Sequence, residues 1–389
     1  MRLSHRLTSL PPYHFAEYNR KIAELRVAGT DVINMSMGDP DLPTPPEIVD
    51  RLCEAACEPA NQRYPDYAGI PELRAGIAAW FRRRFGVELD AAREVLPLIG
   101  SKEGLAHLPL AVMDPGDVAL MPDPAYPVYP AAVTLAGGVC HTLPTDAANG
   151  WLPDLAVVPA ETARAARTLW LNFPNNPTGA SATPEFFAQA VEFARANDVL
   201  LIHDMAYAEV AYDGARPASI LQTPGAKDVA VEFHSLSKAY NMAGFRIGMM
   251  VGNAEIVAAL NRLKTNLDTG IFRPIQHAAV AALNLPESWL TARNAIYQGR
   301  RDRVVAAGRR LGLETPSPEA GLYVWPRVPA GETSAAFALR LLDQAAVAIT
   351  PGTNFGPGGE GYVRIALTVP DAQVDVAMAR LDALVAQRA

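Results

Sequence analysis

The chain has 389 residues, half of them hydrophobic and 19% charged, which allows a substantial core and is ordinary for a globular protein. Its net charge of -7 excludes the basic face that binding to nucleic-acid phosphates requires. Three scattered cysteines, Cys53, Cys57 and Cys140, exclude a disulfide framework, and we expect them to be reduced.

The sequence gives no sign of export or of membrane insertion. Residues 1–10 contain basic side chains without the apolar segment of a signal peptide, and no apolar run reaches the roughly 18 residues that span a bilayer. We therefore expect a soluble cytoplasmic protein. Because the histidines lack metal-ligand spacing, we also expect no bound metal.

In chain order, the first strong pattern is an amphipathic helix after Pro71, with a solvated face that includes Arg82, Arg83 and Arg84. Short apolar runs then predict strands at 95–99, 118–121, 168–172, 199–203, 229–233 and 246–251. Helical patterns fall between and after them, one beginning at the N-cap Thr183 with Pro184 in its first turn. This alternation predicts an α/β domain at 41–284, with a mostly parallel sheet covered on both faces.

The character of the sequence changes at about residue 285. Strand-like runs at 322–325, 347–350 and 362–367 precede a helical pattern at about 370–387. These elements predict a separate, smaller α+β unit at 285–389.

Small, polar or aromatic residues follow five of the predicted strands. They lie at 100–104, 122–127, 174–179, 204–207 and 235–238. The first of these segments reads Gly-Ser-Lys-Glu-Gly and opens a helix, whose free N–H groups suit a phosphate. Since ligands of an open α/β sheet bind beyond the carboxyl ends of its strands, the convergence predicts a binding site at this edge.

The segment around Lys238 is the most specific. It combines Ser235, Ser237 and Lys238 with Arg246 eight residues later, between two apolar runs that read as buried strands. An aldehyde cofactor with a phosphate needs an amine for imine formation, and hydroxyl and cationic groups for the phosphate. With 28 residues from Asn176 to Asp204 and 34 from Asp204 to Lys238, the chain resembles the fold-type I pyridoxal-phosphate (PLP) enzymes. Within them it resembles the class I/II aminotransferases over essentially its whole length.

The resemblance implies a large domain and a smaller α+β domain, the latter built from residues 1–40 and 285–389. It also implies a homodimer with shared active sites, in which Tyr64 reaches the phosphate of the neighbouring subunit. PLP would be the cofactor. The reaction would be a ping-pong exchange between an amino acid and a 2-oxo acid such as 2-oxoglutarate.

The resemblance also assigns roles to single residues. Lys238 would form the Schiff base and move the substrate proton, Asp204 would pair with the pyridine nitrogen, and Tyr126 would stack on the ring. Asn176 and Tyr207 would donate hydrogen bonds to the phenolate oxygen of the PLP ring. Tyr207 would also take part in catalysis. The phosphate cradle would comprise Ser101, Lys102 (through its backbone), Ser235, Ser237 and Arg246.

Arg364 is the main candidate for substrate binding. An arginine within an apolar strand is costly unless it is paired, and its planar fork fits a carboxylate. The resemblance assigns Arg364 to the substrate α-carboxylate, together with Asn176 and the backbone N–H of Gly38. An internal salt bridge is the other reading of this arginine.

The substrate is less well defined. Residues 100–104 and 264–272 look most like the LL-diaminopimelate and succinyl-diaminopimelate aminotransferases, although alanine and aspartate enzymes share much of the pattern. A PLP-dependent β-lyase or cyclising synthase would use nearly the same residues. A non-catalytic regulator of this fold is disfavoured, because it would carry an added DNA-binding segment and only about 40 residues precede the motifs.

Overall fold

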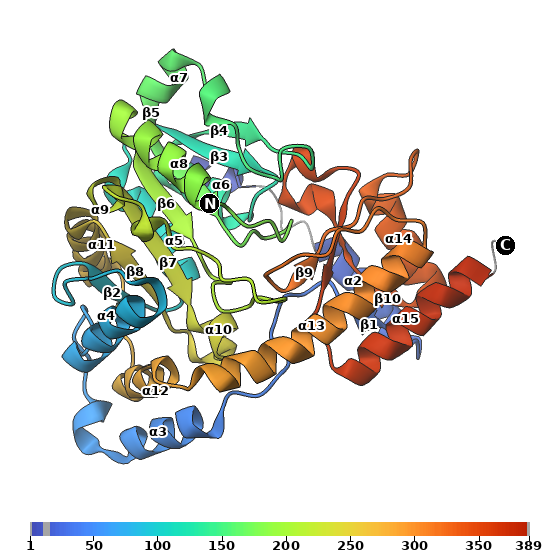
Figure 1. Ribbon diagram of the computed structural model, residues 1–389, viewed down its shortest axis with the longest axis horizontal. Helices are drawn as coiled ribbons and strands as arrows, with labels where there is room; N and C mark the ends of the chain where they lie inside the picture. Colours follow the sequence, from blue (N-terminus) through green and yellow to red (C-terminus); the bar gives the residue numbers. More distant parts are fainter. Residues whose placement is uncertain (1, 11–15, 387–389) are drawn as a thin grey trace.

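A computed structural model describes residues 2–10 and 16–386. It contains a large layered unit, at the left of Figure 1, and a smaller unit at its right, with the long helix α13 (Glu287–Arg310) running between them. The large unit is built on a seven-stranded sheet in the order β2-β8-β7-β6-β5-β3-β4. Strand β8 runs antiparallel to β2 and β7 and the other neighbouring pairs are parallel, so the predicted α/β fold with a mostly parallel sheet is confirmed. The strands are β2 (Val95–Leu98), β3 (Val118–Asp123), β4 (Val139–Pro144), β5 (Ala166–Asn172), β6 (Leu200–Asp204), β7 (Ala230–Ser235) and β8 (Gly248–Gly252).

Both faces of the sheet are covered, because successive side chains of a buried strand point to opposite sides. In β5, Leu169 and Leu171 pack with one set of helices, whereas Trp170 packs with another. The first set includes α3 (Pro46–Cys57), α4 (Pro71–Phe85), α8 (Pro184–Asn197) and α12 (Arg273–Leu283). The second set includes α5 (Ser101–Val112), α6 (Val128–Ala136) and α11 (Ala254–Leu267).

Short elements connect these layers. Those that bear on the site are α10 (Leu236–Ala239), which follows β7 directly, and the 3-10 turn η4 (Ala243–Phe245). The others are η1 (Pro59–Gln62), η2 (Leu155–Val157), α7 (Ala160–Ala165), η3 (Ile220–Gln222) and α9 (Ala226–Val229).

The smaller unit has its own core, formed by β9, β12 and three helices. Its strands are β1 (Ile33–Asn34), β9 (Tyr323–Val324), β10 (Val347–Ala348), β11 (Thr350–Pro351) and β12 (Val363–Ala366). Its remaining elements are α2 (Ala16–Val27), α14 (Ser334–Ala345), η5 (Gly352–Phe355), η6 (Pro357–Gly359) and α15 (Asp371–Ala386). The N-terminal residues divide between the units, since β1 pairs with β10, whereas α1 (His5–Thr8) contacts α6 of the large unit. The domain boundaries at 40/41 and 284/285 therefore stay predictions.

Several predicted elements needed correction. The run 347–350 is two strands that belong to different sheets, because β10 pairs with β1 and β11 pairs with β12. Strand β4 was missed, since its residues are mostly polar or exposed at the edge of the sheet. Strand β8 begins at Gly248 rather than at 246, because Arg246 has a left-handed backbone (φ 52°). The last residue of the predicted 370–387 helix lies outside the described residues.

The face of α4 that carries three arginines is only partly solvated. Arg84 forms an ion pair of 2.8 Å with the buried Glu209, so the prediction was wrong for this residue. All three cysteines are free. Among the helices that the structure describes, none is long and apolar enough to cross a membrane.

Candidate active site

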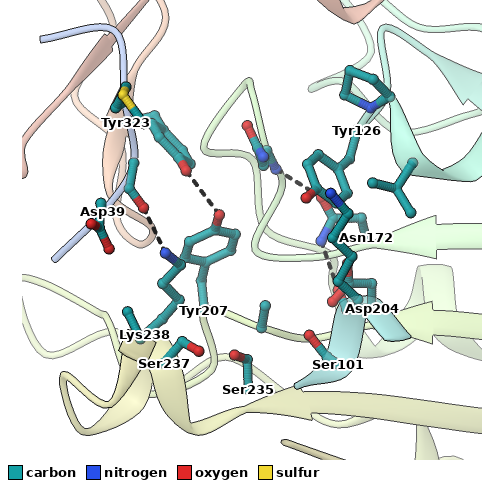
Figure 2. Close-up of a pocket in the computed structure, with 18 of the residues that line it drawn as sticks. Asp39, Ser101, Tyr126, Asn172, Asp204, Tyr207, Ser235, Ser237, Lys238 and Tyr323 are labelled. Carbon is teal, nitrogen blue, oxygen red and sulfur yellow. Dashed lines mark hydrogen bonds between the residues drawn. The ribbon is translucent and has the colours of Figure 1, made fainter. Parts of the chain in front are cut away.

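A cavity of about 580 Å³ lies at the carboxyl ends of the strands of the large sheet and opens between the two units. Figure 2 shows that its walls come from both units, with Tyr323 of the small unit facing Tyr207 of the large one. Twelve of the thirteen predicted site residues line it: Gly38, Ser101, Lys102, Tyr126, Asn176, Asp204, Tyr207, Ser235, Ser237, Lys238, Arg246 and Arg364. Tyr64 is the exception, because it lies outside the cavity with 88% of its surface exposed.

The register of the sheet explains why these residues meet. Asn172, the last residue of β5, lies opposite Asp204, the last residue of β6, and Asp204 lies opposite Phe233 of β7. Parallel strands that end together bring their following residues to one edge. The Asn172 side chain strengthens this edge, because its Nδ2 donates to the Asp204 carbonyl (2.7 Å) and its Oδ1 accepts from the Asn176 N–H (2.8 Å).

Lys238 lies on the one-turn helix α10, directly after β7. Its partly buried amine donates to the Gly38 carbonyl at 2.6 Å, as Figure 2 shows beside Asp39. Burial lowers the pKa of this amine, and nearby Arg364 and Arg246 act in the same direction, against Tyr323 and Asp39. A lysine with a lowered pKa is better able to serve as a nucleophile and a base.

The Asp204 carboxyl group is buried and has one oxygen free. Its Oδ2 accepts a hydrogen bond of 2.7 Å from the Tyr129 hydroxyl, whereas Oδ1 is buried without a partner among the described residues. Burial raises the pKa of Asp204, against the hydrogen bond from Tyr129, the backbone N–H of Ala206 and the charges of His203 and His234. A protonated ring nitrogen placed on Oδ1 would supply the missing partner and favour the carboxylate.

The groups predicted to hold a phosphate gather at the start of α5. Ser101 is the first residue of that helix, where backbone N–H groups lack intrahelical partners and favour an anion. The Arg246 guanidinium lies so close to Gly100 that a Cβ there would be 2.5 Å from Nη2, and Gly100 has a φ of 76°. Ser235 and Ser237 line the same cavity. Hydroxyl, guanidinium and helix N–H donors form a set that fits a phosphate dianion.

Tyr126, Asn176 and Tyr207 lie between the phosphate end and the small unit. Tyr207 is buried, and its hydroxyl lies 3.0 Å from that of Tyr323 (Figure 2). Burial, together with the Tyr323 phenol, raises the pKa of Tyr207 well above its usual value, so Tyr207 stays protonated and able to donate. Tyr126 packs edge-to-face on Tyr129, with ring centroids 5.6 Å apart.

Arg364 closes the other end of the cavity. Its Nη1 donates to Asn176 Oδ1 (2.9 Å) and its Nη2 to the Ser36 carbonyl (2.7 Å), whereas Nε is buried without a partner. Among the described residues, no carboxylate lies within ion-pair distance of Arg364. The alternative reading of Arg364, an internal salt bridge, is therefore absent among these residues. The guanidinium stays available to a carboxylate ligand.

Three contributors to the site were missed by the sequence analysis: Tyr323, Tyr129 and Asn172. Tyr129 carried a weak signal, since it follows Tyr126 in the segment after β3. Asn172 could have been found as the polar end of an apolar strand. Tyr323 carried none, because it reads as an ordinary apolar position of a strand in another unit.

His203 and His234 pack around a buried acid. Glu232 accepts from His203 Nδ1 (2.9 Å) and from His234 Nε2 (2.7 Å), and it also binds the Ser219 hydroxyl. This cluster lies within the sheet behind Asp204. It supports the strand ends and lines no part of the cavity.

The sequence profile of the family "Aminotransferase class I and II" matches residues 30–381. The chain therefore belongs to the class I and II aminotransferases, enzymes that depend on PLP, and the predicted family, fold type and enzyme class are confirmed. The donor set of the cavity and the free Oδ1 of Asp204 fit that cofactor.

Two curated relatives are similar over nearly their whole length. The LL-diaminopimelate aminotransferase of Dehalococcoides mccartyi (strain ATCC BAA-2266 / KCTC 15142 / 195) is 52% identical over 381 residues, covering 98% of each chain. The LL-diaminopimelate aminotransferase of Desulforudis audaxviator is 52% identical over 376 residues, covering 97% of this chain and 96% of the relative. Both support the predicted resemblance to the diaminopimelate branch.

Solved structures show the same architecture. The substrate-bound BacF structure from Bacillus subtilis has a TM-score of 0.94 at 35% identity, covering 99% of this chain and 98% of that one. A probable N-succinyldiaminopimelate aminotransferase from Thermus thermophilus has a TM-score of 0.89 at 38% identity, covering 95% of this chain and 99% of that one.

Proposed function

We propose that this aminotransferase binds PLP in the cavity and moves the amino group of LL-diaminopimelate, or of a closely related amino acid, to a 2-oxo acid such as 2-oxoglutarate. The observation that carries the proposal is the meeting in one cavity of Lys238, Asp204 with its free oxygen, and the unpaired Arg364. The identity of the substrate rests on the relatives, two of which are LL-diaminopimelate aminotransferases at 52% identity.

When bound, PLP supplies an aldehyde that condenses with amines and a ring that accepts electrons. Ser101, Ser235, Ser237 and Arg246 would hold its phosphate, and Tyr126 would cover its ring. Asp204 would keep a proton on the ring nitrogen, because its buried carboxylate needs a cationic partner on Oδ1. Lys238 would take the proton from the substrate Cα and deliver it on the same face, since its lowered pKa favours the free amine.

We also propose a ping-pong order of substrates. Among the described residues, two arginines line the cavity: Arg246 at the phosphate end, and Arg364, which is hydrogen-bonded to Asn176 and Ser36 and is left to bind a carboxylate. An amino donor and a 2-oxo acid both carry an α-carboxylate, so they would compete for this group. The keto product of the donor would then leave before the acceptor binds, and plots of initial rate at several fixed acceptor concentrations would give parallel lines.

A panel of amino donors with 2-oxoglutarate tests the substrate. LL-diaminopimelate should give a higher kcat/KM than alanine or aspartate, with glutamate formed in equal amount to the amino acid consumed. A preference of more than tenfold for alanine or aspartate would replace the proposed donor while keeping the reaction.

A cysteine conjugate tests the β-lyase alternative, because a lyase would release pyruvate and ammonia without any added 2-oxo acid.

The active site would be completed by a second subunit. Tyr64 lies outside the cavity of its own chain and is 88% exposed, and Tyr67, Leu267 and Phe272 are exposed apolar side chains in neighbouring segments. A surface that exposes several large apolar side chains is typical of a protein–protein interface. We propose a homodimer in which Tyr64 reaches the phosphate site of the partner.

Mixing two inactive chains tests this arrangement. A heterodimer of Lys238→Ala and Tyr64→Ala chains would have both defects in one site and an intact second site, so about half of a wild-type dimer's activity should return. The matched control pairs Lys238→Ala with Arg364→Ala, since both residues line the cavity of their own chain and no site is intact in that heterodimer. Equal failure of both mixtures would refute the shared site.

A further inference from the structure

Tyr323 has contacts that the proposed roles of the other residues leave unexplained. It belongs to β9 of the small unit, yet its hydroxyl lies 3.0 Å from the Tyr207 hydroxyl of the large unit. Figure 2 shows the two phenol hydroxyls joined by this hydrogen bond, beside the amine of Lys238. The partner of the Tyr323 hydroxyl is a residue expected to contact the cofactor.

The ring of Tyr323 contacts the guanidinium of Arg364. The Arg364 guanidinium carbon lies 4.1 Å from the Tyr323 ring centroid and 4.7 Å from that of Phe355. Such cation–π contacts stabilise a partly desolvated cation. Because the nitrogen atoms of Arg364 otherwise bind only an amide oxygen and a carbonyl oxygen, the two rings hold the guanidinium without neutralising its charge.

Gly38 makes room for the Tyr323 hydroxyl. A Cβ at Gly38 would overlap that oxygen, so no other residue fits without displacing the tyrosine. The carbonyl of Gly38 in turn accepts the hydrogen bond of Lys238 (2.6 Å). The Tyr323 side chain thus touches Tyr207, Gly38 and Arg364, each from a different segment of the chain.

We propose that Tyr323 is a positioning residue with two separable functions. Its ring holds the Arg364 guanidinium in the plane that receives the substrate α-carboxylate. Its hydroxyl orients the Tyr207 hydroxyl toward the cofactor. The inference rests on the proposed function, because it takes Arg364 as the carboxylate site and Tyr207 as the cofactor donor.

Three variants of the PLP-loaded protein separate the two functions. Tyr323→Phe removes only the hydroxyl and keeps the ring. Tyr323→Leu removes both. Phe355→Leu removes the other ring on Arg364 and leaves the Tyr207–Tyr323 pair intact, so it is the matched control. Two measurements are made on each: the Kd of glutarate, an unreactive dicarboxylate, by calorimetry, and the pH midpoint of the visible absorbance of the bound cofactor.

For Tyr323→Phe we expect an unchanged glutarate Kd and a midpoint raised by a few tenths of a pH unit. Tyr207 becomes a weaker donor when its hydroxyl loses the bond to Tyr323, and the cofactor's ring oxygen then holds a neighbouring proton more tightly. For Phe355→Leu we expect a Kd raised about fivefold and an unchanged midpoint. For Tyr323→Leu we expect both changes.

An unchanged midpoint in Tyr323→Phe would overturn the function of the hydroxyl, and an unchanged Kd in Tyr323→Leu would overturn that of the ring. The isosteric Phe variant keeps the test decisive if the Leu variant fails to fold, which its thermal melt would reveal; Phe355→Leu then decides whether an aromatic face matters to Arg364. A wild-type protein that binds glutarate and PLP but transfers no amino group would refute the proposed function alone. Wild-type behaviour in every variant would refute this inference alone.

Discussion

The two walls of the cavity are built in different ways. The wall from the large unit consists of residues at or just after the ends of parallel strands, such as Asp204 at the end of β6 and Lys238 after β7. The wall from the small unit brings together Gly38, Tyr323 and Arg364 from three distant segments. The first wall holds the groups that would perform the chemistry on one rigid sheet, and the second holds those that would recognise a carboxylate. We therefore expect defects in the first wall to lower kcat and defects in the second to raise KM.

The largest effect is expected in the first wall from Lys238→Ala. Removal of the amine eliminates the base and the nucleophile together, so kcat should fall by at least about 10³-fold. Lys102→Ala is the comparison, because Lys102 lines the same cavity with an exposed side chain and should cost less than about tenfold. Steady-state rates of glutamate formation measure both. A loss below tenfold in Lys238→Ala would mean that Lys238 is neither the base nor the nucleophile.

Asp204→Asn should lower kcat by about 100-fold while PLP still binds. The neutral amide keeps the shape and the Tyr129 contact but cannot hold a proton on a ring nitrogen, and this stabilisation is realised mainly in the transition state. Stopped-flow measurement of the half-reaction with an amino donor gives the rate. A change below about threefold, or ~0.7 kcal/mol, would mean that the aspartate is only structural.

In the second wall, Arg364→Lys should raise the KM of both substrates by roughly tenfold and change kcat less. An ammonium cannot reproduce the planar fork that binds Asn176, Ser36 and a carboxylate together. Initial rates with each substrate varied in turn provide the test. If only one KM rose, the amino donor and the 2-oxo acid would use different carboxylate sites, and the ping-pong order would lose its structural basis.

The first wall was largely predictable from the sequence, because parallel strands place their ends together and short polar motifs mark those ends. Ten of the predicted residues that line the cavity belong to this wall, and the other two, Gly38 and Arg364, belong to the second. The second wall was less predictable, since the contacts of Tyr323 depend on how the small unit docks. The contacts of Arg293 in α13 could not be predicted for the same reason, because they join segments far apart in the sequence. Its guanidinium donates to the carbonyls of Lys238 and Glu209 (both 2.6 Å).

The acid cluster behind the first wall should make stability depend on pH. Burial opposes ionisation of Glu232, but hydrogen bonds from His203 and His234 outweigh it and lower its pKa to about 2. In the unfolded chain its pKa is about 4.3, so as the pH falls below that value the unfolded state binds more protons and the stabilisation is lost. By about pH 3.5 this should amount to about 1 kcal/mol.

Urea unfolding at about pH 6.5 and about pH 3.5 measures that loss. Glu232→Gln should be less stable than wild type at the higher pH but should lose about 1 kcal/mol less on acidification. Equal losses in the two proteins would mean that other carboxylates account for the acid sensitivity. The charge of Glu232 would then contribute nothing to the free energy of unfolding.

Tyr129→Phe tests whether the first wall also depends on residues behind it. The Tyr129 hydroxyl is the hydrogen-bond donor to Asp204 Oδ2 (2.7 Å), and its ring packs 5.1 Å from that of Trp170. Loss of one hydrogen bond to a buried charge costs about 1–2 kcal/mol. Without this bond the Asp204 carboxylate would be less well oriented toward the ring nitrogen of the cofactor. We therefore expect kcat to fall roughly five- to thirtyfold with KM unchanged. Tyr297→Phe is the control, since its buried hydroxyl has no partner among the described residues and its removal should change neither constant. If Tyr129→Phe matched that control, Asp204 would be positioned by the end of its own strand alone.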